Sequence, residues 1–247
     1  MNKKVSFYLK MFLFLIIAIL LDIPIVYYLI PNVPDILTEI IPFRQFTPAL
    51  AYLLFILIFK NDYIPIVIKP NKYFLKKFLL GILIPIIALG TITIGAFIIW
   101  RTGGIFRNLS NITPILIINI IIGTLGEEIG WRSFLLTAFE KRHNVLLSSI
   151  IVGIMWFLWH TNRWAWGIFY VITHLIICIL FTIIMSAVLK DTKNNLIVAM
   201  MLHSSFNLAD EVFSINLYNI ILGLFITALI CIISDKKYFM KTEMQIT

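Results

Sequence analysis

TPILIINIIIGTLGEEIGWRSFLLTAF, residues 113–139, is an apolar run that is interrupted near its middle by Glu127, Glu128 and Arg132. A helix needs about 20 apolar residues, at about 1.5 Å per residue, to cross the hydrocarbon core of a bilayer, and this run is long enough. A charge at the centre of such a helix costs about 2.5–3.5 kcal/mol on insertion scales, and charges there commonly mark functional sites. The stretch therefore predicts a membrane helix that carries a functional site.

The rest of the chain has the same apolar character. Hydrophobic residues make up 61% of the 247 residues and charged residues 13%, and the mean hydropathy is +0.99. A soluble domain is nearer one-half apolar and one-quarter charged, so this class is excluded. Eight apolar runs are expected to form spans, at about 8–30, 40–59, 78–100, 113–139, 144–161, 167–189, 195–209 and 215–233. We expect an all-α, polytopic transmembrane bundle of about eight helices, forming one domain over residues 1–247.

The loop charges predict how this bundle is oriented. With both termini placed in the cytoplasm, 15 Lys and Arg residues fall in cytoplasmic loops and termini and four in the opposite loops. Positive charge in short loops favours the cytoplasmic side, so this bias supports eight helices with cytoplasmic ends. The net charge of +8 is explained by this orientation and requires no nucleic-acid partner.

The first polar motif is the Glu-Glu-x-x-x-Arg of the central run. On a helix Glu128 and Arg132 are four residues apart, share a face and can form an ion pair. Glu127 is rotated by about 100° from Glu128 and remains the spare carboxylate, which suits a general base. The alternative is an ion-pair cluster that only fixes the helix register, which leaves the second glutamate unexplained.

Two further motifs follow on later runs. Trp156 and His160 are four residues apart, as are His203 and Asn207, so each pair shares a helix face. An imidazole and an amide can donate hydrogen bonds to a developing oxyanion. The alternatives are an interfacial anchor for His160 and a hydrogen-bonded pair between helices for His203 and Asn207. His174 and Asp22 have no evident partner at helical spacing, and we expect both to be structural.

Together the three motifs supply a base, a partner imidazole, a charge neutraliser and two oxyanion donors, which suffice for attack of water on an amide. Their order resembles that of the CPBP family, which comprises CAAX prenyl protease 2, bacteriocin-processing and Abi proteins. The motif core lies at about 113–209, and the Gly-Trp-Arg-x-Phe-Leu-Leu continuation of the first motif is its most specific part. The family often has Phe where Trp156 stands.

The resemblance implies an intramembrane endopeptidase that cleaves a membrane-associated peptide or protein. By analogy Glu127 and His160 activate the water, and Glu128 with Arg132 orients the site. The resemblance also assigns His203 and Asn207 to the oxyanion. Family members are labelled either metalloproteases or glutamate-dependent proteases, and the sequence leaves open a zinc site at Glu127, His160 and His203 as well as a site without metal.

Other functions remain open at this stage. The same chemistry would serve peptide maturation or bacteriocin self-immunity. A proton-coupled transporter also uses intramembrane carboxylates and histidines, although no inverted repeat is evident. A non-catalytic membrane scaffold would keep the polar cluster for the fold alone. The abundance of Ile, Lys and Asn suggests an AT-rich bacterial genome, and we therefore expect a multi-pass protein of a bacterial cell membrane whose partners are the lipid bilayer and the substrate.

Overall fold

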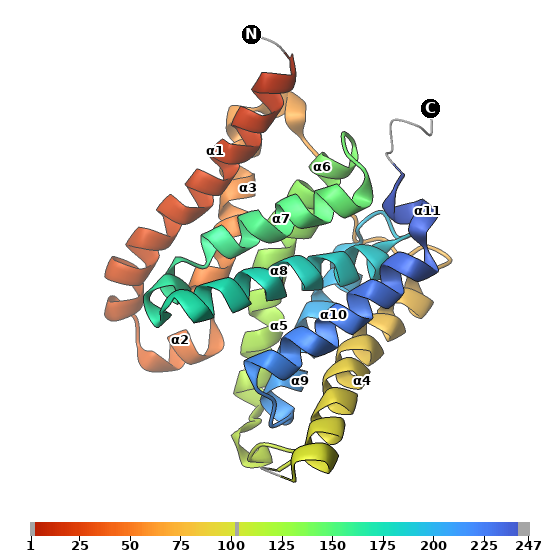
Figure 1. The fold of residues 1–247 in the computed structure, drawn as a ribbon. Helices are drawn as coiled ribbons and strands as arrows, with labels where there is room; N and C mark the ends of the chain where they lie inside the picture. The colour runs from red at the N-terminus through yellow and green to blue at the C-terminus, as the bar shows by residue number, and fades with distance from the viewer. Residues whose placement is uncertain (1–2, 102–103, 242–247) are drawn as a thin grey trace.

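The computed structural model describes residues 3–101 and 104–241, and every regular element in these ranges is a helix (Figure 1). This confirms the all-α fold. The α-helices are α1 (Lys3–Pro24), α2 (Asp35–Ile40), α3 (Thr47–Ile58), α4 (Phe74–Trp100), α5 (Pro114–Glu128), α6 (Thr137–Glu140), α7 (Val145–Trp159), α8 (Ile168–Leu189), α9 (Leu196–Val212), α10 (Leu217–Ser234) and α11 (Lys236–Phe239). The 3-10 and π segments are η1 (Ile25–Leu29), η2 (Ile30–Asn32), η3 (Phe43–Phe46), η4 (Lys60–Asp62), η5 (Leu109–Asn111), η6 (Ile129–Leu136) and η7 (Thr161–Trp166).

The helices differ in how well they match the thickness of a bilayer. Within the described ranges, five segments are long and apolar enough to cross it: Ser6–Asn32, Phe74–Trp100, Pro114–Glu140, Ile168–Leu189 and Leu217–Ser234. The other three expected runs contain the shorter helices α3, α7 and α9, of 12, 15 and 17 residues. The chain is thus a multi-pass membrane protein, and full crossing by the three short helices stays a prediction.

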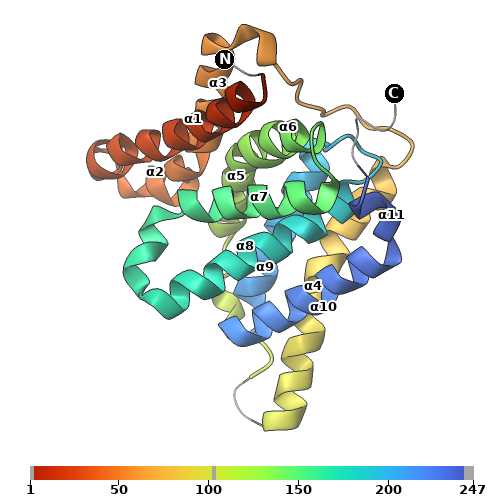
Figure 2. The same cartoon turned by 45° about the horizontal axis from the view of Figure 1, so that its top comes forward.

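The helices form a bundle in which α5 is surrounded by helices from both halves of the chain (Figures 1 and 2). The segment α5–η6 packs against α3 on one side and α9 on another, while α7 packs along α8, and α8 along α10. Helix α4 lies against α9 and α10. This arrangement brings together the elements that carry the three polar motifs, although the motifs are separated in sequence.

An aromatic core holds η6 in place beside the polar residues. Phe14 of α1 meets Trp131 of η6 at a ring-centroid distance of 5.7 Å, and Phe55 of α3 meets Phe134 at 4.8 Å. All four side chains are at most 1% exposed. Aromatic pairs in such contact add about 0.5–1.5 kcal/mol beyond the burial of their area. The π segment that bears Arg132 is therefore fixed from the α1–α3 side.

Two glycines permit close helix contacts next to the site. A Cβ atom on Gly126 would lie 2.5 Å from the backbone oxygen of Gln45, and one on Gly153 would lie 2.7 Å from the Cα atom of Ile179. Both distances are too short for a real side chain. Small residues of this kind allow backbones to approach closely in membrane bundles, where van der Waals packing drives association.

Charged and amphipathic residues lie mainly at the ends of the bundle. The described chain starts and finishes at the same end (Figure 1), where Lys190 pairs with Asp235. The hydrogen bond from Lys190 holds the pKa of Asp235 below its usual range. At the other end Arg44 donates to Asp22 through Nε at 2.8 Å, so the expectation that Asp22 is structural is consistent with this ion pair. The side of the membrane on which each end lies stays a prediction.

Candidate active site

The helix changes its geometry at the paired glutamates. The Thr113 side chain accepts a hydrogen bond from the N–H of Leu116 and Pro114 occupies the first turn, which is a favourable start for α5. The α-helix ends at Glu128, and the chain continues as the π-helix η6 from Ile129. The apolar run indicates a helix but contains no signal for this change of geometry. Wider π turns occur frequently at functional sites because they alter how consecutive side chains are directed.

Glu128 is the centre of a buried ionic network. Its Oε1 atom lies 3.0 Å from Nη1 of Arg132 and 2.7 Å from Nδ1 of His203 on α9. Glu128 and Arg132 are both 0% exposed, and His203 is 4% exposed. The expected ion pair is confirmed, and the histidine of the third motif joins it. Arg132 also donates from Nη2 to Thr182 of α8 at 3.4 Å, so the network links η6 with two further helices.

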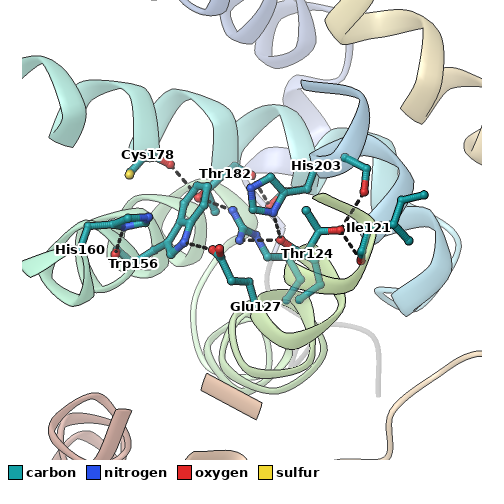
Figure 3. Close-up of polar contacts among 12 residues, drawn as sticks. Ile121, Thr124, Glu127, Trp156, His160, Cys178, Thr182 and His203 are labelled. Atoms are coloured by element: carbon teal, nitrogen blue, oxygen red, sulfur yellow. Dashed lines mark hydrogen bonds and ion pairs between the residues drawn. The ribbon is translucent and has the colours of Figure 1, made fainter. Parts of the chain in front are cut away.

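Glu127 points toward Trp156 of α7 (Figure 3), whereas Glu128 points to His203 of α9, as the rotation between consecutive residues requires. Its Oε2 atom accepts a hydrogen bond from the indole N–H of Trp156 on α7, at 2.7 Å. Glu127 has no ion-pair partner in the described part of the chain. The expectation of one paired and one spare carboxylate therefore agrees with the geometry.

Trp156 joins all three motifs. Besides its bond to Glu127, its ring lies under the guanidinium of Arg132, with Cζ 4.1 Å from the centroid. The edges of His160 and His203 both meet this ring, at centroid distances of 5.4 and 5.3 Å. An arginine over a tryptophan face is an attractive cation–π contact. The sequence indicates only an aromatic wall here, whereas the indole contacts Glu127, Arg132 and both imidazoles.

His160 caps α7 at its C-terminal end. Its Nδ1 atom donates to the backbone carbonyl of Trp156 at 2.8 Å, which leaves Nε2 as the available ring nitrogen. His160 and Glu127 both line a cavity of about 400 Å³, together with Gln45, Asn119 and Arg163. Further lining residues are Ile30, Thr38, Ile41, Pro42, Phe43, Arg44, Trp159 and Asn162. Glu127 and His160 therefore face one common space.

A larger cavity, of about 830 Å³, lies elsewhere and is lined by Ser133, Lys190 and Asp235 among others. None of the six predicted site residues lines it. We assign the chemistry to the smaller cavity because functional groups define a catalytic site and volume alone does not.

A count of residues along the sequence would place the three motifs at different depths in the membrane. Straight helices counted from one membrane surface would stagger Glu127, His160 and His203 by up to about 12 Å along the bundle, at about 1.5 Å per residue. Instead α7 crosses the α5 segment obliquely (Figures 1 and 2), and Trp156 contacts both imidazoles. Glu127, His160 and His203 therefore meet at one indole ring.

The third motif is only partly assembled. His203 faces Glu128 and Trp156, but Asn207, one turn later on α9, is half-buried and has no hydrogen-bond partner within the described ranges. Neither residue lines the smaller cavity. The oxyanion assignment of His203 and Asn207 stays a prediction.

Several supporting residues carry no signal in the sequence. Thr124 and Ser204 share a hydrogen bond of 2.7 Å that ties α5 to α9 beside the glutamates. His174 is not isolated as expected: its Nε2 atom lies 3.7 Å from Sγ of Cys178, four residues later. The helical spacing of this pair is visible in the sequence, but a cysteine in an apolar run indicates no more than a packing residue.

The zinc site left open by the sequence is not assembled. Oε2 of Glu127 is engaged by Trp156 and Nδ1 of His203 by Glu128. Among the described residues, the group of metal-binding donors that lies close enough to share an ion is His160, His174 and Cys178. Glu127, His160 and His203 therefore do not fit as a three-ligand centre.

Comparison with known proteins identifies the central region. Residues 109–209 match the family model described as type II CAAX prenyl endopeptidase Rce1-like, and this range contains all six predicted site residues. The chain is 28% identical over 154 residues to CAAX prenyl protease 2 of Methanococcus maripaludis, covering 57% of this chain and 56% of that protein.

Staphylococcal proteins are also similar. Lysostaphin resistance protein A of Staphylococcus haemolyticus is 32% identical over 103 residues, which cover 41% of this chain and 28% of the relative. The protein of that name from Staphylococcus epidermidis is 24% identical over 174 residues, covering 67% and 45%. The chain thus spans about half or less of the length of these relatives. The motif order, the family match and these relatives together place the central region of this multi-pass membrane protein, residues 109–209, in the CPBP family.

Proposed function

We propose that the protein is an intramembrane endopeptidase that hydrolyses a peptide bond of a membrane-associated peptide or protein. One observation carries the proposal: Glu127 and His160 line the same cavity, although they come from different helices. A carboxylate and an imidazole that face one space are the minimum for activating a water molecule. The similarity to CAAX prenyl protease 2 of Methanococcus maripaludis supports a peptidase.

Glu127 is the general base in this mechanism. It removes a proton from a water molecule as the water oxygen attacks the carbonyl carbon, and it later passes that proton to the leaving nitrogen. The Trp156 indole holds Oε2 of the carboxylate, so that the carboxylate has a fixed orientation toward the cavity. His160 is held through Nδ1 and offers Nε2 to the same water. Fixed groups of this kind lower the barrier because little reorganisation is needed.

Glu128 and Arg132 act as positioning residues. Their ion pair fixes the π segment and orients His203 through Nδ1. His203 and Asn207 are proposed to donate hydrogen bonds to the oxyanion. Because neither lines the cavity in this structure, the substrate carbonyl must approach past the Trp156 ring or displace it.

The cavity bears on the class of substrate. Arg44, Asn119 and Arg163 add polar groups to its lining, while Ile30, Ile41 and Phe43 add apolar ones. This mixture suits an extended peptide with a polar backbone near an apolar anchor. We propose a membrane-tethered peptide or the terminus of a membrane protein, in keeping with peptide maturation or self-immunity.

The test compares purified wild type with Glu127→Gln on a library of membrane-tethered peptides, analysed by mass spectrometry. We expect Glu127→Gln to lose at least about 100-fold in cleavage rate, since general acid–base catalysis contributes about 10²- to 10⁴-fold. The matched control is Glu211→Gln, at the end of α9 and away from the cavity, which should cleave like wild type.

The outcomes distinguish the three functions. Cleavage by Glu127→Gln at the wild-type rate would reject the proposed base. If neither protein cleaves while both fold and bind peptides equally, a scaffold is favoured. If neither cleaves but wild type acidifies proteoliposomes and Glu127→Gln does not, a proton-coupled transporter is favoured. Repeating the assay with a chelator shows whether a metal ion is required.

A further inference from the structure

A cluster of potential metal ligands includes His160 of the proposed catalytic pair and two residues of α8. His160, at the end of α7, packs against His174 of α8 with a ring-centroid distance of 4.7 Å, nearly perpendicular at 82°. Cys178 lies one turn further along α8, with its Sγ atom 3.7 Å from Nε2 of His174. Each of the three residues offers one donor atom, and these atoms lie within 4.8 Å of one another. The proposed function uses only the first of them.

The spacing fits coordination of one ion. Zinc–nitrogen bonds of about 2.0–2.1 Å and zinc–sulfur bonds of about 2.3 Å, at tetrahedral angles, place the two donor atoms about 3.5 Å apart. The separation of 3.7 Å between His174 and Cys178 is close to this value. His160 needs only a small side-chain movement to join them, because all three donors already lie within 4.8 Å.

The orientation of His160 also suits a ligand. Its Nδ1–H is held by the Trp156 carbonyl at 2.8 Å, so Nε2 carries the lone pair. Metal-binding histidines usually donate their other ring N–H to a carbonyl or carboxylate, which fixes the ring and its tautomer. This outer contact is therefore present before any ion binds. The carbonyl that accepts it belongs to Trp156, whose side chain donates to Glu127.

The charges around the cluster can accommodate a divalent cation. Arg132 and Arg163 are the nearby cations. Arg132 is paired with Glu128, whereas the Arg163 guanidinium donates to the Tyr170 hydroxyl at 2.9 Å and lies over the Trp166 ring. Cysteine binds metals as the thiolate, so coordination by Cys178 adds a negative charge beside the ion. Cys178 is 1% exposed, and its surroundings are apolar. A thiolate there is unfavourable unless a cation neutralises it, and the bound metal ion would be that cation.

An ion can enter from the cavity. His160 lines the space of about 400 Å³ that also contains Glu127, whereas Cys178 closes the inner side of the cluster. Three protein ligands with one open side resemble zinc sites whose fourth position holds water or an exchangeable group. A mixed set of two imidazoles and one thiolate favours zinc or copper over magnesium or calcium.

We propose that His160, His174 and Cys178 form a binding site for a soft divalent metal ion such as zinc, with the fourth position open to the cavity. This site is distinct from the Glu127, His160 and His203 set considered from the sequence. It uses the same Nε2 atom of His160 that the proposed mechanism offers to the water, so a bound ion would take His160 out of water activation. The existence of the metal site does not depend on peptide cleavage.

Cobalt(II) is the probe, added to full-length protein purified in detergent. Thiolate coordination gives a near-ultraviolet charge-transfer band, and tetrahedral geometry gives intense visible bands. We expect wild type to bind one cobalt ion with both signatures, and zinc to displace it. Cys178→Ser should lose the charge-transfer band, whereas Cys231→Ser should retain it. Cys231 is the matched control because it is the other cysteine, on α10.

Histidine variants provide an independent check. His174→Gln should weaken cobalt binding by more than about 100-fold, since loss of an outer-shell contact alone costs about 10- to 100-fold. His143→Gln, in the α6–α7 connection, should bind like wild type. A circular-dichroism melt of each variant separates loss of binding from loss of fold.

Two results would overturn the site. One is a wild-type protein that remains folded but shows no charge-transfer band at saturating cobalt. The other is a band that survives in Cys178→Ser and disappears in Cys231→Ser. Neither measurement uses a substrate, so failure of the metal site and failure of the proposed peptidase are separate outcomes.

Discussion

At the scale of single residues, the central finding is that two adjacent glutamates have different partners. Glu128 contacts Arg132 and His203, whereas Glu127 accepts a hydrogen bond from Trp156 and faces the cavity. A helix turns by about 100° between neighbours, so consecutive side chains contact different helices. The difference in helix position therefore gives Glu128 an ion-pair partner and leaves Glu127 as the candidate base.

Arg132→Ala is expected to destabilise the protein strongly. The substitution leaves the Glu128 carboxylate buried at 0% exposure without its arginine, and His203 remains as a hydrogen-bond partner. Removing one partner of a buried ion pair costs about 3–5 kcal/mol. Thermal unfolding in detergent, followed by circular dichroism, measures the loss.

The control is the double variant Glu128→Leu with Arg132→Leu, which removes both charges. We expect it to be more stable than Arg132→Ala, because it leaves no unpaired charge in the interior. Equal stability of Arg132→Ala and wild type would contradict the role of the pair.

Trp156→Phe tests the contact that orients the proposed base. Phenylalanine keeps an aromatic face for Arg132 but removes the N–H that donates to Glu127. A hydrogen bond to a charged group contributes about 1.5–3 kcal/mol, so we expect cleavage by the folded variant to fall by about 10- to 100-fold, and thermal unfolding measures the stability lost with the same bond. Trp164→Phe, in the exposed η7 segment, is the control. An unchanged kcat for Trp156→Phe would show that the indole bond is dispensable.

At the scale of secondary-structure elements, close contact between η3 and α5 positions the site. Gly126 immediately precedes the two glutamates and packs against the backbone of Gln45. Gln45 also lines the smaller cavity. A change in this spacing would move Glu127 relative to the cavity wall.

Gly126→Ala is expected to destabilise the bundle by about 1–3 kcal/mol, the usual cost of forcing an extra methyl group into a packed interior. The new Cβ atom would lie 2.5 Å from a backbone oxygen, which cannot rotate away as a side chain can. Gly95→Ala in α4 is the matched control, because, apart from its chain neighbours and the backbone of its own helix, no atom of the described residues lies within 4 Å of the place that its methyl group would occupy. Thermal unfolding of both variants gives the comparison, and equal stability would contradict the close contact.

At the scale of the whole molecule, the orientation in the membrane decides which compartment supplies substrate. The two ends of the described chain lie at one end of the bundle (Figure 1), and both are expected in the cytoplasm. The smaller cavity is lined by Arg44 and Arg163, which belong to loops assigned to the opposite side. We therefore expect substrate to enter from the non-cytoplasmic face or laterally from the membrane.

Reporter fusions test this orientation. Alkaline phosphatase fused after Arg107 should be active, because the enzyme works only outside the cytoplasm, and green fluorescent protein fused after Lys193 should fluoresce. The reciprocal fusions serve as controls. The reverse pattern of activities would invert the topology and assign the cavity to the cytoplasmic side.

The class of fold and the candidate motifs were predictable from the order of apolar and polar residues. Apolar runs predict membrane helices because an unpaired backbone polar group is costly in lipid, and helices satisfy these groups locally. The Glu128–Arg132 pair and the separate environment of Glu127 were also predictable, since both depend only on the angular spacing along one helix.

Which motifs meet, and through which residue, depends on how the helices pack against one another. The bond of Trp156 to Glu127 and the approach of His160 to His174 and Cys178 join side chains from different helices. Such contacts depend on the inclination and rotation of packed helices. These are determined by interlocking surfaces such as Gly126 against Gln45, and periodicity within a single helix contains no information about them.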